Sequence, residues 1–251
     1  MRPPRPAARI ASIPSERPRS LGHFGQITRR DRRTSAPPVR ATSVLSVPRM
    51  IDASKLLRPG LLEGVSLLIA QVPQGDDARP LAQAVDSACA GLGARVSMLR
   101  AGHAPKADTD LLVIDAGQSF ARERAHAAPA KRDASRTALR ACLDGAWEAT
   151  RAVANTAFID PARAGRIVYL APAPGTEAAG LAQHAEAARA GLENLARTLS
   201  IEWARYGITT VTIAPGMHSG DHEVAALVAY LGSPAGAYFS GCLLDLRGPA
   251  G

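Results

Sequence analysis

The sequence is short of the residues and segments that mark several common classes of protein. Its three cysteines, Cys89, Cys142 and Cys242, lie far apart and without the spacing of a metal site. No apolar run approaches the roughly 20 residues that cross a bilayer, and no apolar segment of a secretory signal is present. We therefore expect a cytoplasmic protein with reduced thiols, no metal and no contact with a membrane.

Lysine is scarce as well, with three residues against 27 arginines. The formal net charge of +8 suggests a nucleic-acid partner until the charges are located. Residues 1–49 carry 11 arginines and two acidic residues, whereas the rest of the chain carries 19 basic and 20 acidic residues. The folded part is close to neutral, so no basic groove and no nucleic-acid partner are expected.

Residues 1–49 are rich in proline, arginine and serine and hold too little apolar surface to fold. Three interpretations are open: translation that begins at Met50, a disordered basic tail, or an organelle-targeting segment. The excess of arginine and alanine, typical of GC-rich bacterial genomes, favours the first. We expect residues 50–251 to form one domain, because 46% hydrophobic content over this length suits a single sizeable core.

Hydrophobic patterns in residues 50–251 alternate between two periods. Short β-branched or apolar runs predict buried strands, and apolar stripes that step by three and four residues predict helices. Strands alternating with helices predict a parallel sheet covered on both faces. The expected strands are 64–71, 94–99, 110–117, 165–172, 208–213 and 241–246, and the expected helices are 78–93, 135–159, 188–206 and 221–232.

One stretch, "AGLENLARTLSIEWARYGITTVTIAPG" (residues 190–216), resembles a helix, strand and Pro-Gly turn of the short-chain dehydrogenase/reductase family. The strands "LLVIDAG" and "GRIVYLAPAPG" resemble two further strands of that family, and the likeness extends over residues 61–248. The resemblance implies an α/β fold with a doubly wound, Rossmann-like parallel sheet. It also implies NAD(H) or NADP(H) as cofactor and hydride transfer to or from a carbonyl or alcohol carbon.

The catalytic residues of that family do not carry over. Its tyrosine and lysine lie four residues apart, its serine 13 residues before the tyrosine, and an asparagine on an earlier helix. Those positions hold Ala185, Arg189, Pro172 and Cys142. Alanine has no proton to donate, so we assign no catalytic residue. His184 is one position away from the tyrosine site, which turns it about 100° around the helix.

The glycine-rich loop of the family corresponds to Ala70–Asp77, where only Gly75 is kept and where two aspartates, Asp76 and Asp77, oppose a phosphate. Arg100 follows the second strand, where an arginine favours NADP(H). We expect no dinucleotide, or NADP(H) if any binds. The candidate cofactor-binding residues are Gly75, Arg100, Ala116, Gly117, Pro215 and Gly216.

Two segments of the family are missing. Only ten residues, 101–110, separate the second expected strand from the segment "LLVIDAG", too few for the usual helix and edge strand. After Pro215-Gly216 the substrate lid is replaced by a short link to the last helix, with Gly220 in place of a threonine. We therefore expect the sheet without its third strand and without the lid.

Three functions remain open. The first is a non-catalytic member of the family that forms homo-oligomers, or hetero-oligomers with an active relative, through segments 135–158, 188–206 and 223–248. The second is an NADP(H)-dependent oxidoreductase with His184 or Tyr169 as a displaced acid. The third is a nucleotide- or metabolite-sensing module built on the turn at Gly75. A decayed gene without function is the remaining possibility.

Overall fold

The computed structural model of the chain describes residues 56–72, 79–100, 103–118, 120–121, 132–175 and 182–247, with backbone alone for 132–135. All of them belong to the unit Val47–Gly251. The predicted tail 1–49, Gly75 and the aspartates at 76 and 77 lie outside the described residues. Among the described residues, no helix has both the length and the apolar character that a bilayer crossing requires.

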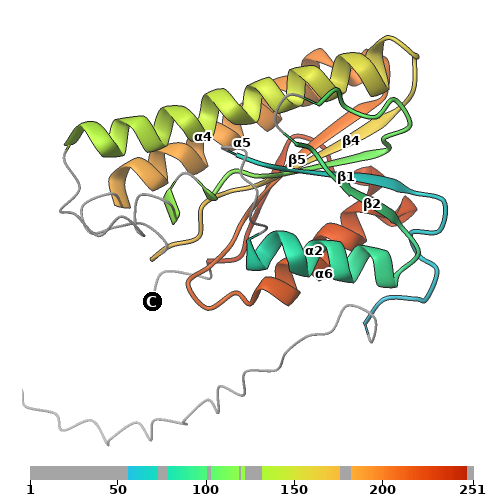
Figure 1. Ribbon diagram of the computed structural model, residues 1–251, viewed down its shortest axis with the longest axis horizontal. Coiled ribbons are helices and arrows are strands. Elements are labelled where there is room, and N and C mark those ends of the chain that lie inside the picture. Colours follow the sequence, from blue (N-terminus) through green and yellow to red (C-terminus); the bar gives the residue numbers. More distant parts are fainter. Residues whose placement is uncertain are drawn as a thin grey trace, which may run out of the picture. The chain divides into compact units, whose positions relative to one another are not determined.

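The elements follow the predicted order, strand and helix in alternation (Figure 1). The strands are β1 (Ser66–Gln71), β2 (Arg95–Met98), β3 (Leu111–Asp115), β4 (Gly165–Leu170), β5 (Ile208–Ala214) and β6 (Cys242–Asp245). The helices are α2 (Pro80–Gly91), α4 (Arg132–Val153), α5 (Ala182–Glu202) and α6 (Asp221–Gly232), and α4 runs on into a π-helical turn at Ala154–Ile159.

All strand pairs of the six-stranded sheet are parallel, in the order β2-β1-β3-β4-β5-β6. The predicted doubly wound sheet is therefore confirmed. As predicted, the described residues between β2 and β3 form no further strand. The chain leaves β1 toward β2 and then returns to the other side of β1 to form β3. The strand order thus reverses between β1 and β3, and this switch point is where ligands of open α/β sheets bind.

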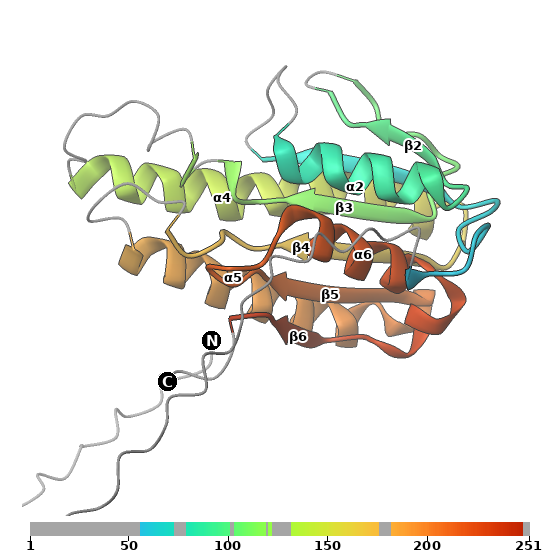
Figure 2. The same cartoon turned by 90° about the horizontal axis from the view of Figure 1, so that it is seen from below.

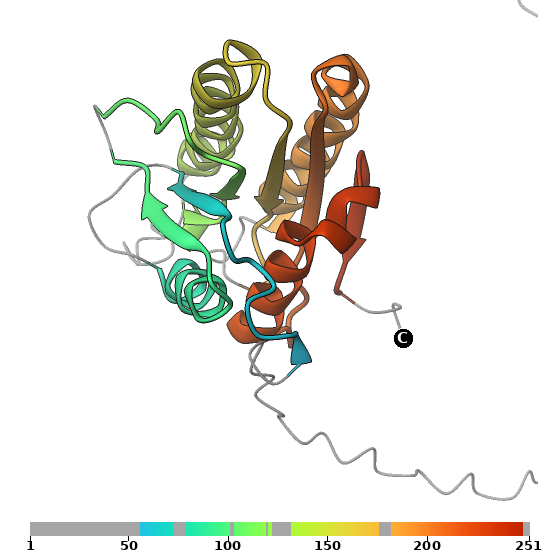
Figure 3. The same ribbon diagram turned by 90° about the vertical axis from the view of Figure 1, so that its right-hand side faces the viewer.

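Helices cover both faces of the sheet, with α4 and α5 on one and α2 and α6 on the other (Figures 1 and 3). The crossover β5–α6–β6 therefore has the opposite hand to β4–α5–β5, because it continues in the same direction with its helix on the opposite face. This places α6 directly against α2, and Figure 2 shows the two helices side by side. Both helices begin at the carboxyl edge of the sheet.

Each face of the sheet carries its own apolar core. Leu68, Ile114 and Ile167 belong to the core under α4 and α5, whereas Ile69 and Val113 belong to the core under α2 and α6. Alternation along each central strand divides the side chains in this way, because neighbouring side chains of a strand point to opposite faces.

Strand β2 lies at the edge of the sheet and differs from the central strands. Its residues are exposed or half-buried, and its face on the α4 side begins with Arg95 and Ser97. Arg95 Nη2 donates to Ser66 Oγ at 2.7 Å, and Ser97 Oγ donates to the Leu67 carbonyl at 3.4 Å. Polar side chains thus occupy the part of the sheet that a further helix would otherwise have to cover.

The helix ends follow the sequence signals with small differences. Gly207 has φ +71° and closes the turn after α5. Helix α5 ends at Glu202 rather than at Tyr206, because the last predicted turn is a separate 3₁₀ turn, Ala204–Tyr206. On α4, the side chain of Trp147 is 39% exposed and stacks on Trp203, with ring centroids 6.5 Å apart.

Candidate functional site

The candidate cofactor residues that the structure describes all lie at the carboxyl edge of the sheet. Ala116 and Gly117 follow β3, Pro215 and Gly216 follow β5, and Arg100 follows β2. The first four are buried and Arg100 is exposed. The sheet therefore brings Ala116 and Gly117 to the switch point and Pro215 and Gly216 to the same edge two strands away, but all four are buried.

An ion pair between Arg79 and Asp115, which no sequence pattern predicted, lies at the switch point. Arg79 is the residue that precedes α2, with extended backbone and no side-chain cap bond, and its side chain turns inward. Its Nη1 donates to Asp115 Oδ1 at 2.6 Å, and the Gly117 amide donates to the same oxygen at 3.2 Å. The side chain of Asp115 is 1% exposed and that of Arg79 is 18% exposed, so this pair is largely withdrawn from water.

Arg79 also covers Gly117. A methyl group added at Gly117 would lie 2.7 Å from Arg79 Nη1 and 3.5 Å from the Pro172 Cα. The glycine at the end of β3 therefore leaves room for the guanidinium of the chain itself.

Burial raises the pKa of Asp115, while the Arg79 guanidinium and the Gly117 amide oppose that shift. Asp221, at the start of α6, adds a smaller repulsion that raises the pKa further. Asp115 Oδ2 and the Nε2 atom of the neighbouring Gln71 are buried and have no hydrogen-bond partner among the described residues. The switch point is thus a buried, polar and crowded place with one close ion pair.

The four positions of the family's catalytic residues are also buried. Cys142 and Ala185 are fully covered, and Pro172 is buried at the end of β4. Arg189 is 4% exposed, and its Nε donates to the Pro172 carbonyl at 2.5 Å. The arginine is therefore bonded to the backbone of the residue that stands in the place of the serine. None of these four groups offers an acidic proton to a bound substrate.

Arg189 belongs to a chain of charges that crosses from α5 to the end of β6. It pairs with Glu186 one helical turn earlier, and Glu186 Oε2 accepts from Arg247 Nη1 at 3.0 Å. Arg247 also pairs with Asp245 at 2.7 Å, which raises the pKa of Arg247 and lowers that of Asp245. Sequence reasoning missed these partners, because 61 residues separate Glu186 from Arg247.

The turn after β5 is covered by the same C-terminal segment. A methyl group added at Gly216 would lie 2.3 Å from the Leu246 carbonyl oxygen and 3.0 Å from the Arg247 Cα. Gly216 therefore serves the close approach of two backbone segments. The link from Gly216 to α6 is short, as predicted, and the Glu223 carboxylate accepts from the Gly220 amide at 3.2 Å.

The two candidate replacement acids lie in different surroundings. Tyr169 is fully buried in the core under α4 and α5, where its hydroxyl and Thr150 Oγ1 are 2.9 Å apart. Burial raises the pKa of this hydroxyl above its ordinary value, and no substrate reaches it in this structure. His184 is half-buried on the first turn of α5, next to Ala185.

Comparison with known proteins identifies the family. A family model described as enoyl-(acyl carrier protein) reductase matches residues 97–222, which is half of the chain. The chain belongs to the short-chain dehydrogenase/reductase family. A relative in Bacillus subtilis (strain 168), described as a probable 2,4-dienoyl-CoA reductase, is 30% identical over 42% of this chain and 53% of that protein. The chain thus matches about half the length of that relative.

Solved structures of the family share the fold. A citronellol catabolism dehydrogenase of Pseudomonas aeruginosa has a TM-score of 0.58 at 22% identity and covers 76% of this chain and 96% of its own. A short chain dehydrogenase from Mycobacterium smegmatis has a TM-score of 0.59 at 20% identity, with coverage of 76% and 95%. The enoyl-[acyl-carrier-protein] reductase (NADH) of Aquifex aeolicus VF5 has a TM-score of 0.55 at 16% identity, with coverage of 74% and 96%.

The described residues do not fit the dinucleotide that this family implies. A ligand at the switch point would have to displace Arg79 from Gly117, which leaves the carboxylate of Asp115 buried without its cation. Gly216 is covered by backbone, which a side-chain movement cannot remove. Arg100 is the exception, because it is exposed and lines a groove of about 480 Å³ with Leu99, Val72 and residues of α4.

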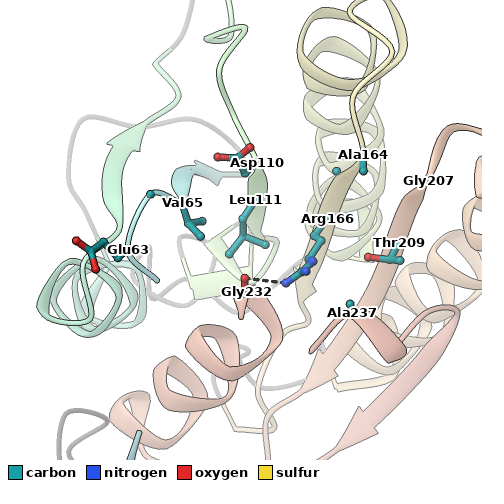
Figure 4. Close-up of a pocket in the computed structure, with 12 residues that line it drawn as sticks. Glu63, Val65, Asp110, Leu111, Ala164, Arg166, Gly207, Thr209, Gly232 and Ala237 are labelled. Atoms are coloured by element: carbon teal, nitrogen blue, oxygen red, sulfur yellow. Dashed lines mark hydrogen bonds between the residues drawn. The ribbon is translucent and has the colours of Figure 1, made fainter. Parts of the chain in front are cut away.

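A larger cavity of about 570 Å³ lies at the opposite, amino edge of the sheet (Figure 4). Two of the charged groups around it, Arg166 and Asp110, form hydrogen bonds with other parts of the chain. Arg166 Nη1 donates to the Gly232 carbonyl at 2.7 Å and so caps the end of α6, and Asp110 accepts from Arg163 and from the Ser66 amide. Burial lowers the pKa of Arg166. Arg166 and Asp110 therefore hold neighbouring elements of the fold together.

Proposed function

We propose that this chain is a non-catalytic member of the short-chain dehydrogenase/reductase family that acts as a subunit of an oligomer, either with itself or with an active relative. One observation carries the loss of catalysis: the places of the proton donor and its helper hold a buried alanine, Ala185, and an arginine bound to the Pro172 carbonyl. Hydride transfer to a carbonyl needs a proton donor within hydrogen-bond reach. Retained helices without retained chemistry favour a structural role.

The outer face of α4 and α5 supports the assembly part of the proposal. Trp147 is 39% exposed and Ile201 is 73% exposed, and Ala187 and Ala190 add small exposed side chains on α5. Small residues let a partner helix approach closely, and exposed aromatic side chains are enriched where proteins bind. The pair of helices therefore offers a surface suited to a second pair.

Light scattering after size exclusion tests the assembly. The full chain should elute as a dimer or larger, alone or when mixed with active reductases of the family. The change Ile201→Glu should shift it toward the monomer, because a charge would be buried in the interface. The matched control Ser87→Glu adds the same charge to an exposed position on α2 and should change nothing. Monomers in every mixture would refute the assembly.

A second candidate function is that of an NADP(H)-dependent oxidoreductase with displaced catalytic groups. The exposed Arg100, which lines the groove of about 480 Å³, favours this function. An arginine in this position can bind the 2′-phosphate of NADP(H). Thermal shift with NADPH and NADH, on the full chain and on Arg100→Ala, separates the candidates. A shift with NADPH that is lost in the variant supports this second function. No shift with either dinucleotide removes it.

A further inference from the structure

We infer that two clusters of charged side chains, Arg79–Asp115 and Arg189–Glu186–Arg247, close the crevice of this fold, so that the chain's own side chains take the place that a dinucleotide would fill. The inference rests on the loss of catalysis proposed above, and it does not depend on assembly. In the folded chain without a bound molecule, the crevice is then closed.

The first cluster closes the crevice at the switch point. Arg79 stands at the start of α2, where backbone amides and the helix dipole would otherwise attract an anion. Its guanidinium reaches the carboxylate of Asp115 and lies on Gly117. A phosphate that approached this helix would meet a cation already neutralised by a buried carboxylate. The anion that satisfies Arg79 is therefore part of the chain.

The second cluster closes the crevice on the side of the substrate. Glu186 binds Arg189 and Arg247 at once and so ties α5 to the segment after β6. That segment packs on Gly216 through its backbone. In the described part of the chain only a short link joins β5 to α6, and the ion pairs of Glu186 lie beside this turn. Helix, strand end and C-terminal segment are thereby held together without a bound molecule.

The two clusters differ in strength. The pair at Asp115 is nearly buried, whereas Glu186 and Arg247 are 54% and 34% exposed. Solvent weakens exposed pairs, so the second cluster is expected to open more readily than the first. The Arg79–Asp115 pair is therefore the part of the closure on which the test is built.

Amide hydrogen exchange, read at Gly117, tests the closure on the full chain. The Gly117 amide donates to Asp115 Oδ1, and Arg79 holds that carboxylate in place. We expect slow exchange in the wild type, unchanged by NADPH or NADH at about 1 mM, the upper end of ordinary substrate affinities. Arg79→Ala should raise the exchange rate at Gly117 at least tenfold. The control Arg151→Ala breaks an exposed pair with Glu148 on α4 and should leave it unchanged.

Two outcomes overturn the inference. The first is slower exchange at Gly117 when either dinucleotide is added to the wild type. The second is an Arg79→Ala protein that exchanges at Gly117 no faster than the control. If Arg79→Ala fails to fold, the double variant Arg79→Met, Asp115→Asn keeps the volume and removes the charges. Faster exchange in it supports the closure, and wild-type exchange contradicts it.

Hydrogen exchange with added dinucleotide, an assay of turnover and the mass in solution together separate this inference from the proposed function. Dinucleotide binding without turnover would overturn the closure and leave the loss of catalysis standing. Binding with turnover would overturn both. A monomeric mass would remove the assembly and would leave the closure untouched.

Discussion

Replacing Arg79 by alanine should destabilise the protein in a way that depends strongly on pH. The variant leaves Asp115 buried without its cation, and breaking a buried pair in this way costs about 3–5 kcal/mol. The carboxyl can escape that cost by taking up a proton. Its ordinary pKa is 3.8, and each unit between that value and the pH costs about 1.4 kcal/mol.

The sign follows from the raised pKa of Asp115 in the folded protein. A raised pKa favours the protonated carboxyl in the fold, so its contribution to stability is full below 3.8 and is lost as the pH rises. Removing Arg79 raises the pKa of Asp115 in the folded protein further, because the guanidinium that lowers it is gone. The loss of stability therefore continues to higher pH. Because protonation of Asp115 is always available, the free energy lost by the variant cannot exceed the cost of that protonation, about 5 kcal/mol at pH 7.5 and about 1.6 kcal/mol at pH 5.0.

Urea unfolding at pH 5.0 and pH 7.5, at one ionic strength, measures the difference. Arg79→Ala should lose about 3–5 kcal/mol at pH 7.5 and at most about 1.6 kcal/mol at pH 5.0, in addition to a packing loss equal at both. Asp115→Asn provides the control: relative to that variant, the added change Arg79→Ala should cost the same at both pH values, because the titrating carboxyl is absent from both proteins. An equal loss for Arg79→Ala at both pH values would show that Asp115 is not the group left unpaired, and the reasoning would fail.

Three further changes test other contacts of the fold. Tyr169→Phe should cost about 1 kcal/mol in urea unfolding, because Thr150 loses its buried partner; an unchanged midpoint would contradict this. Gly216→Ala should cost about 1–3 kcal/mol, because its methyl group would meet the Leu246 carbonyl at 2.3 Å. Gly91→Ala, with nothing within 4 Å, is its control and should not destabilise the protein. Cys89 and Cys142 should resist a disulfide reagent at pH 8 until the chain unfolds, since burial raises the pKa of both thiols to about 12. Rapid modification of the native protein would refute that account.

The fold could be predicted from the sequence because buried strands and helices space their apolar residues in characteristic ways. Alternating strands and striped helices predicted the six strands and their parallel sheet. The missing third strand was implied by the resemblance to the family. The apolar stripe of α4 does not reveal where its edge meets solvent, and Trp147 on this helix is 39% exposed.

The candidate site was harder to predict, because its contacts join distant positions. Nothing near Arg79 marks it as the partner of Asp115, which lies 36 residues further along the chain. Glu186 and Arg247 likewise meet only after α5 and β6 are in place. The replaced catalytic residues could be named from spacing, but the groups that fill the crevice required the folded chain.

Strand β2 has a consequence for how copies of this chain meet in solution. A strand at the margin of a sheet exposes backbone groups that can recruit another chain and so begin fibre growth. This margin is only four residues long and starts with an exposed arginine, Arg95. A second copy of the chain that paired its β2 with this strand could form only a few backbone hydrogen bonds. The Arg95 side chains of the two copies would also repel each other. Shortening the sheet thus left a border that discourages uncontrolled stacking.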